Sequence, residues 1–351
     1  MALKLLERAF IREKSIKRID NYLSLSKNHR ISVGFYYKGE KYILEEAYRD
    51  SDYQYDIGSI SKTITAHFVL LLETEGLINT NDSVDKYLAL PEGEYPTIYE
   101  LLTHSAGYGN LTPREITVPR LLMHGYARKN LYTGCTVNTV IRALSRRRRK
   151  DKAGKYGYSD FAFAILACIV ESVLKRPFSD AFEDFVKTRL GMRETKLMPD
   201  VNLRTPKSAY GKFTIPFWRW NERNPYVAAG GLVSTVGDML EYSRLEIESR
   251  EAFITKAHVK TDVFAKHHNI QMRLGWHSYK NSDQLWHVGG VGTFRSSMII
   301  NKKRGFAVIV MGNAQGKRAD NVHYIAKMLY SDFKNKRIKF SRVKNEDNNE
   351  I

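Results

Sequence analysis

The placement of strand-like segments at both ends of the chain, with helical segments between them, most constrains the possible fold. Near the N-terminus, residues 31–37 and 42–48 are rich in aromatic and β-branched residues and flank a Lys38-Gly39-Glu40 turn, which predicts a β-hairpin. Near the other end, turn sequences separate four strand-like runs, at residues 272–279, 284–288, 293–300 and 306–311. The pattern predicts an antiparallel sheet assembled from both chain ends.

The middle of the chain is mainly helical. Residues 161–174 predict a helix that is apolar on nearly every face and is therefore buried. Apolar residues from 60 to 72 recur at helical spacing, and residues 1–27 predict an amphipathic helix. We therefore expect an α/β (α+β) fold, with an antiparallel sheet flanked by helices. Its expected parts are an α/β part from residues 1–80 and 215–340, a mainly helical insertion at 81–214, and a polar C-terminal tail at 341–351.

The composition indicates a soluble protein with a substantial core. Of the 351 residues, 43% are hydrophobic, and the longest uninterrupted apolar run is Phe161–Val170. That run is far shorter than the roughly 20 residues that a membrane span needs. Charged residues interrupt the first 18 positions, where a signal peptide would be apolar. The two cysteines, Cys135 and Cys168, cannot make a disulfide framework, so we expect a cytoplasmic location.

The net charge of +18 is concentrated in two short segments. Residues 142–155 contain eight basic residues and one acidic residue, and residues 334–344 contain six basic residues and no acidic one. We favour the interpretation of two solvated basic surfaces, because short charge runs usually face water. Two alternatives stay open. One is contact with an anionic membrane surface or, less favoured, with nucleic acid; the other is attraction of an anionic substrate.

One serine stands out as a candidate nucleophile. Such a serine needs a partner for its hydroxyl proton, and a lysine three residues later lies on the same helix face. Only Ser59, paired with Lys62, follows a strand-like segment and a glycine and opens a long apolar-faced helix, whose N-terminus favours an anion. The alternative is that Ser59 merely caps that helix. The spacing itself occurs six times, at Ser24/Lys27, Ser59/Lys62, Ser83/Lys86, Ser172/Lys175, Ser331/Lys334 and Ser341/Lys344.

Several segments, taken in order, resemble the serine β-lactamase and penicillin-binding-protein-like hydrolases. The segment YDIGSISKTITA, at residues 55–66, is similar to their active-site signature. The resemblance is to the branch of class C β-lactamases, D-aminopeptidases and esterases, and it spans roughly residues 30–315. It implies a β-lactamase/transpeptidase-like fold. The other similar segments lie at residues 76–88, 97–108, 152–166, 190–197, 228–239 and 285–297.

The resemblance implies a catalytic role for three residues. Ser59 would be the acylated nucleophile, and Lys62 would accept or shuttle its proton. Tyr158, in the segment that is similar to the family's Tyr-x-Asn element, would be the second group that handles protons.

The resemblance also implies how the substrate is held. His287 and Gly289 form a His-x-Gly element, expected on an edge strand that lines the cleft, with His287 standing where other branches carry lysine. The backbone N–H groups of Ser59 and Gly290 would form the oxyanion hole.

The sequence departs from the family pattern at Asp160, where the family prefers asparagine. A carboxylate close to Lys62 would favour the ammonium form and make this lysine a poorer base. Proton abstraction could then fall to Tyr158. Asp160 could instead hold a substrate ammonium group, or the site could be impaired.

The function implied by the resemblance is acyl transfer through an acyl-enzyme, with no metal or organic cofactor. The substrate would be an amide or ester: a D-amino-acid peptide, a small ester or a β-lactam-like molecule. The alternative is a catalytically impaired relative that binds or regulates. The remaining histidines are less informative, since His258, His267 and His268 predict surface positions rather than a metal site, and His104 predicts a packing role. No oligomeric state is predicted.

Overall fold

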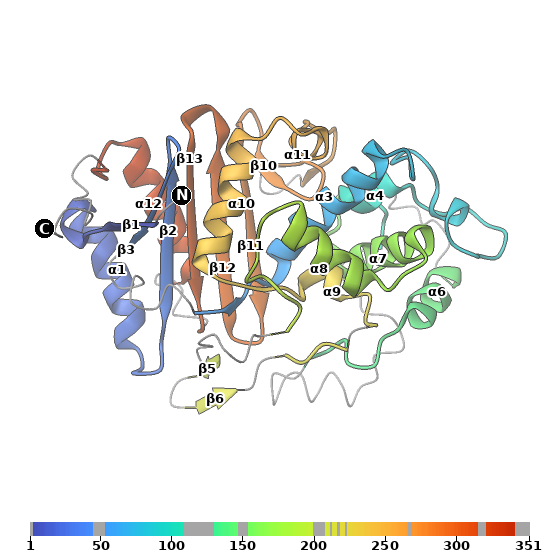
Figure 1. Ribbon diagram of the computed structural model, residues 1–351, viewed down its shortest axis with the longest axis horizontal. Coiled ribbons are helices and arrows are strands. Elements are labelled where there is room, and N and C mark those ends of the chain that lie inside the picture. Colours follow the sequence, from blue (N-terminus) through green and yellow to red (C-terminus); the bar gives the residue numbers. More distant parts are fainter. Residues whose placement is uncertain are drawn as a thin grey trace, which may run out of the picture.

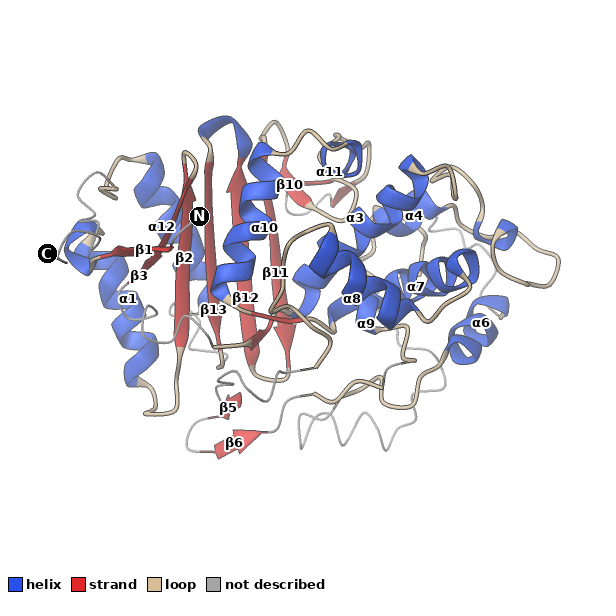
Figure 2. Cartoon of the chain, in the orientation of Figure 1, coloured by secondary structure: helices blue, strands red, loops and turns tan. Residues whose placement is uncertain are grey.

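Strands from both ends of the chain meet in one nine-stranded sheet, beside which a helical part packs (Figures 1 and 2). This confirms the predicted α+β fold. The computed structural model describes residues 3–44, 53–108, 130–146, 154–198, 208–210, 213–215, 218–221, 223–265, 269–314 and 321–340. In order across the sheet, the strands are β1 (Leu3–Leu6), β3 (Glu40–Leu44), β2 (Ile31–Tyr37), β13 (Phe306–Gly312), β12 (Phe294–Asn301), β11 (Gln284–Val291), β10 (His277–Tyr279), β9 (Ile270–Met272) and β8 (Phe264–Ala265).

The N-terminal segment differs from the predicted single helix. Leu3–Leu6 form the edge strand β1, and helix α1 covers only Glu13–Ser24. Leu6 is fully buried at this edge, and Lys4 forms an ion pair with Glu40 of β3 at 3.2 Å. β1 pairs with β3 in parallel, so the sheet is mixed rather than antiparallel throughout.

Two turns near the C-terminus also lie elsewhere than predicted. The predicted run 272–279 is two strands, β9 and β10, because Gly275 takes a φ of +80° between them. The predicted turn at the GGVG sequence is also wrong. Gly289 and Gly290 continue β11, and the chain turns at Gly292, which has a φ of +55°.

Helices cover both faces of the sheet, as Figure 1 shows for α10 (Val236–Glu248) on one face. Side chains along β13 alternate between two cores. Ile309 lies in the larger core beneath α10, whereas Val308 lies in the second core, beneath α1 and α12 (Val322–Lys334).

The helical part is built around α3 (Ser61–Thr74), in which residues 61–72 are all buried. The predicted buried helix is confirmed as α7 (Asp160–Leu174), and Ser159 caps it by accepting a hydrogen bond from the Ala162 N–H at 3.0 Å. No helix in the described part of the chain is long and apolar enough to cross a membrane. The other helices are α4 (Ile98–Leu102), α6 (Val137–Ser145), α8 (Phe178–Thr188), α9 (Val227–Gly230) and α11 (Ala252–Ala257). Two small sheets pair β4 (Tyr55–Asp56) with β7 (Val233–Ser234), and β5 (Ser208–Tyr210) with β6 (Phe213–Ile215).

Candidate active site

Ser59 lies on a single 3-10 turn, Gly58–Ile60, between β4 and α3. Gly58 has a φ of +52°, and a Cβ there would lie only 2.5 Å from the backbone nitrogen of Gly290. A Cβ on Gly289 would overlap the carbonyl oxygen of Ile57. Glycine at both positions therefore lets the turn pack directly on β11, which brings Ser59 and Gly290, the predicted oxyanion-hole residues, to one cavity.

Lys62 lies in the first turn of α3 with its side chain completely buried. Its Nζ donates to Ser59 Oγ at 3.0 Å and to the Ala229 carbonyl at 2.6 Å, and it pairs with Asp160 Oδ1 at 2.7 Å. Burial lowers the pKa of Lys62, but Asp160 and Tyr158 outweigh burial and raise that pKa above its ordinary value. Lys62 is therefore held as an ammonium group.

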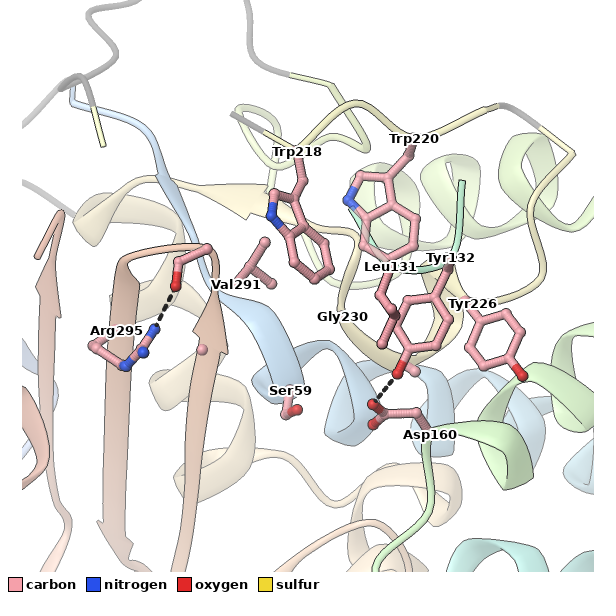
Figure 3. Close-up of a pocket in the computed structure, with 13 residues that line it drawn as sticks. Ser59, Leu131, Tyr132, Asp160, Trp218, Trp220, Tyr226, Gly230, Val291 and Arg295 are labelled. Carbon is pink, nitrogen blue, oxygen red and sulfur yellow. Dashed lines mark hydrogen bonds between the residues drawn. The ribbon is translucent and has the colours of Figure 1, made fainter. Parts of the chain in front are cut away.

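Asp160, the first residue of α7, lies beside Lys62, as the sequence predicted. Its second oxygen, Oδ2, accepts a hydrogen bond from the Tyr132 hydroxyl at 2.6 Å (Figure 3). Tyr132 is itself held by a stack on Tyr226, with ring centroids 4.1 Å apart. Both carboxylate oxygens of Asp160 therefore already have a partner within the protein.

Tyr158 joins the same site from the segment that precedes α7. Its ring centroid lies 5.0 Å from Lys62 Nζ, and Lys62 and Ser59 are both near enough to its hydroxyl to lower the pKa of the phenol. Burial raises the pKa of the Tyr158 phenol more than the nearby Lys62 lowers it. At neutral pH Tyr158 is therefore a phenol rather than a phenolate.

His104, for which the sequence predicted only a packing role, holds the Tyr158 segment in place. Its ring centroid lies 4.5 Å from that of Tyr158. Its Nδ1 accepts a hydrogen bond from the Ser159 N–H at 3.2 Å, and its carbonyl accepts one from Gly157 at 2.8 Å. The one sequence signal for this role is the similarity of residues 97–108 to a family segment.

His287 lies on β11, but β11 is not the predicted edge strand. β12 pairs along the whole of β11, and β10 pairs on the other side at Leu285 and Trp286 only. Because β10 is just three residues long, the side of β11 that starts at His287 is left for the Ser59 turn. Only this end of β11 lines the site.

His277 and Tyr156 complete a group of rings beside Tyr158. His277, on β10, lies 4.9 Å from His287 and 6.3 Å from His104 between ring centroids. The Tyr156 hydroxyl lies 3.3 Å from His277 Nε2. Within the described residues, no group of three or more histidine, cysteine, aspartate or glutamate side chains is arranged to hold a metal ion.

A cavity of about 280 Å³ opens above Ser59 (Figure 3). One wall is aromatic, with Trp218 and Trp220 beside Tyr132, whose ring is stacked with that of Trp220 at 6.2 Å. Arg295 lies on the opposite wall, and its guanidinium donates to the carbonyls of Gly292 and Phe294. This wall was not among the predicted site residues, although the WRW sequence at residues 218–220 is a visible signal.

Several sequence predictions fall outside the described residues. These are most of the basic segment 142–155, from residue 147 to residue 153, together with His267, His268 and the tail 341–351. The described start of the second basic segment is residues 334–340. Residue 334 is the last residue of α12, and residues 335–340 follow that helix. The segment lies apart from the residues that line the cavity.

The chain is similar to known proteins along most of its length. A family model described as Beta-lactamase matches residues 32–330. Protein flp of Staphylococcus aureus (strain MW2) is 22% identical over 302 residues, which cover 79% of this chain and 55% of that protein. The D-alanyl-D-alanine-carboxypeptidase/endopeptidase AmpH of Escherichia coli (strain K12) is 25% identical over 201 residues, covering 55% of this chain and 49% of that protein. The chain thus spans about half the length of these curated relatives.

A solved structure shows the same fold. The octameric penicillin-binding protein homologue from Pyrococcus abyssi superposes with a TM-score of 0.75 at 20% identity, covering 92% of this chain and 77% of that one. This confirms the predicted β-lactamase/transpeptidase-like fold. The family match also supports the prediction of a serine hydrolase. Because the matched region takes in most of the sequence, the chain belongs to the β-lactamase family.

Proposed function

We propose that this protein is a serine hydrolase or acyltransferase that acts on an amide or ester bond through an acyl-enzyme on Ser59. One observation carries the proposal. Ser59 Oγ lies within hydrogen-bond distance of Lys62 Nζ and beside Tyr158, at the floor of a cavity large enough for a small acyl group. The family match supports the same chemistry.

The proposed reaction has two halves. Ser59 Oγ attacks the acyl carbon, and the backbone N–H groups of Ser59 and Gly290 stabilise the oxyanion that develops, an effect worth about 10²–10³ in rate per donor. The leaving amine or alcohol takes up a proton and departs. Water, or a second amine, then releases the acyl group from Ser59.

The proposed substrate is a D-amino-acid peptide, a small ester or a β-lactam-like molecule. The aromatic wall of Tyr132, Trp218 and Trp220 favours an apolar acyl group, because burial of apolar surface stabilises such a complex. Arg295 on the opposite wall favours a substrate that also carries a negative charge. The cytoplasmic location and the contact with anionic membranes stay predictions.

A second candidate is a catalytically impaired relative that binds its ligand without turning it over. The observation that favours it is the ion pair between Asp160 and Lys62, which removes the free amine that a lysine base needs. Such a protein would retain ligand in the cavity and would release no product.

Covalent labelling tests the proposed function. The purified protein is treated with a fluorescent penicillin, a fluorophosphonate and chromogenic esters, and the modified residue is mapped by mass spectrometry. We expect labelling at Ser59 and its loss in Ser59→Ala. Ser172→Ala is the matched control, because Ser172 has the same spacing to Lys175 but donates its hydroxyl to the Tyr87 carbonyl. Labelling at another serine, or ester turnover in Ser59→Ala within tenfold of the wild type, would contradict the proposal.

A further inference from the structure

Helices α1 and α12 carry a basic surface that the proposed reaction does not use. They pack against each other on one face of the sheet, at the end of the molecule away from α7 (Figure 1). Near the start of α1, Ser15 donates a hydrogen bond to the Asp332 carboxylate near the end of α12. Further along α1, the Arg18 guanidinium lies 5.9 Å from the centre of the Tyr324 ring, near the start of α12. The two helices therefore run antiparallel, and their outer faces form one continuous surface.

Basic residues line the outer faces of both helices. Their spacing of three, four or seven residues places them on one side of each helix. The lysines among them are exposed, whereas the opposite side of each helix is buried in the second core. This α1–α12 surface consists of Lys14, Lys17, Arg18, Tyr324, Lys327 and Lys334.

The acidic residues of the two helices do not neutralise this surface. Asp332 is buried and forms an ion pair with Arg12 at 3.7 Å, and Asp20 pairs with Arg8, which precedes α1. Glu13 is the remaining acidic residue of the two helices. The four lysines of the α1–α12 surface form no ion pair with any residue that the structure describes. Five basic side chains therefore face water with one acidic residue beside them.

The residues that follow α12 add further positive charge beside this surface. The N–H of Lys339 donates to the Phe10 carbonyl at 3.0 Å, just before α1. The Phe340 ring lies 4.9 Å from that of Tyr42 and packs against the second core. These contacts fix the segment 335–340 beside the start of α1. Its basic residues are exposed, and they are Lys336, Arg337 and Lys339.

We propose that the α1–α12 surface binds the surface of an anionic phospholipid membrane. Lysine ammonium groups are compact charges on flexible stems, which suits an array of headgroup phosphates better than one fixed partner. Each lysine close to such a membrane strengthens binding about fivefold, so several lysines on one surface act together. Tyr324, whose side chain is 41% exposed among these charges, supplies an amphipathic ring of the kind that lies at headgroup level. The proposed contact is peripheral and does not involve Ser59.

A nucleic acid would meet the same charges, but the shape of the α1–α12 surface fits it less well. The major groove of a DNA duplex admits a single helix, whereas α1 and α12 lie side by side with the sheet behind them. Binding of single strands depends on aromatic rings that are open for bases to stack on. The exposed ring of this surface, Tyr324, is covered by the Arg18 guanidinium. A broad membrane surface matches a pair of parallel-lying helices better than either form of nucleic acid.

Vesicle binding by the full chain tests the proposal. The protein is sedimented with vesicles of phosphatidylcholine alone and with vesicles that also contain phosphatidylglycerol, and the bound fraction is measured. We expect binding only to the vesicles with phosphatidylglycerol. The binding should be lost at about 1 M salt, where the screening length falls to about 3 Å. Equal binding to both kinds of vesicle, or binding to neither, would overturn the proposal.

A combined variant locates the contact on the molecule. Replacing the four lysines of the α1–α12 surface with glutamine should lower the vesicle partition coefficient at least about tenfold, whereas arginine at the same four positions should retain binding. The matched control removes four exposed lysines outside this surface and so changes the net charge equally. It should alter binding by less than about twofold, because these lysines lie away from the proposed contact. The control variant combines Lys86→Gln, Lys175→Gln, Lys256→Gln and Lys260→Gln.

Two further outcomes would overturn the proposal. Equal losses in the two combined variants would show that net charge, and not the α1–α12 surface, binds the vesicles. Tighter binding of the wild type to a DNA duplex than to the anionic vesicles, at the same salt concentration, would assign the surface to nucleic acid. Both variants should unfold at the melting temperature of the wild type, which shows that the fold is intact. Acylation of Ser59 is measured separately, so failure of the membrane contact leaves the proposed function standing.

Discussion

His67 of α3 and Glu246 of α10 form a hydrogen-bonded pair in which both side chains are completely buried. His258, which ends α11, reaches the other carboxylate oxygen of Glu246 at 2.5 Å. Burial raises the pKa of Glu246, but the two histidines outweigh burial and lower the pKa from 4.5 to about 2. One carboxylate thus joins α3, the helix that carries Lys62, to α10 and α11.

Glu246→Gln should therefore destabilise the protein. A pKa lowered from 4.5 to about 2 corresponds to about 3 kcal/mol of unfolding free energy, similar to the cost of breaking other buried pairs. The contribution is fully present above pH 4.5 and is lost as the pH falls from 4.5 towards 2, because the carboxylate becomes protonated. Urea unfolding at pH 7 and pH 4 measures it, and the gap between variant and wild type should narrow at pH 4.

The control is Glu75→Gln, at the exposed C-terminal end of α3. This change should shift the unfolding free energy by less than about 0.5 kcal/mol, as is usual for exposed positions. A loss in Glu246→Gln that is the same at both pH values would show that the carboxylate charge is not what joins these helices.

The sheet and the buried helix α7 could be predicted because their signals are local. Alternating or continuous apolar runs mark the strand at 306–312 and the strands beside it, and residues 161–174 are apolar on nearly every face. Strand β1 could not be predicted, because its four residues are held by pairing with β3, far along the chain. The extent of β11 could not be predicted either. Its glycines suggested a turn, but they instead allow close contact between β11 and the turn that carries Ser59.

The candidate site was predictable only where the residues stand in recognisable motifs. Ser59, Lys62 and Asp160 do so, and the structure brings them together. Tyr132 and His277 stand in no motif, and their places beside Asp160 and His287 result from tertiary packing alone. A sequence without aligned relatives carries no signal for such contacts.

Asp56→Asn should stabilise the protein at alkaline pH. Asp56 lies on β4, and neither of its carboxylate oxygens has a hydrogen-bond partner within the described part of the chain. Burial raises the pKa of Asp56 well above 3.8, so the folded protein holds this carboxyl in its neutral form. Stability is therefore lost as the pH rises above about 4, where the unfolded chain gains by ionising this group.

Thermal unfolding of the Asp56→Asn variant at pH 5 and pH 8 measures this effect. The gain in melting temperature over the wild type should be larger at pH 8. An equal or smaller gain at pH 8 would show that Asp56 is ionised in the folded protein.

Gly289→Ala should disrupt the site more than the fold. The added Cβ would overlap the Ile57 carbonyl, which also accepts a hydrogen bond from Ser296 Oγ at 2.6 Å. The turn that carries Ser59 must then move away from β11, and the two oxyanion donors separate. We expect kcat/KM for an ester to fall by at least about 10², the cost of losing one such donor.

The control is Gly237→Ala on α10, where the nearest atom to the new Cβ lies 3.7 Å away and where alanine favours the helix. It should leave kcat/KM unchanged. If Gly289→Ala hydrolyses the ester at the wild-type rate, the contact between the Ser59 turn and β11 does not set the oxyanion geometry.

Asp160→Asn should change the rates for substrates with free and with blocked N-termini by the same factor. Asp160 was a candidate anchor for a substrate ammonium group, but Oδ1 is taken by Lys62 and Oδ2 by Tyr132. A substrate amine would have to share one of these oxygens with its present partner, so it would gain little from a carboxylate whose charge Lys62 already offsets. We therefore expect the ratio of kcat/KM for a D-alanyl anilide and its N-acetyl counterpart to change by less than about threefold, which is under 1 kcal/mol.

Asp180→Asn, an equal change of charge at an exposed position of α8, is the control for long-range electrostatics. A fall in this ratio of tenfold or more, seen in Asp160→Asn and not in Asp180→Asn, would instead assign Asp160 to the recognition of a substrate amine and would make Lys62 its competitor for the same carboxylate.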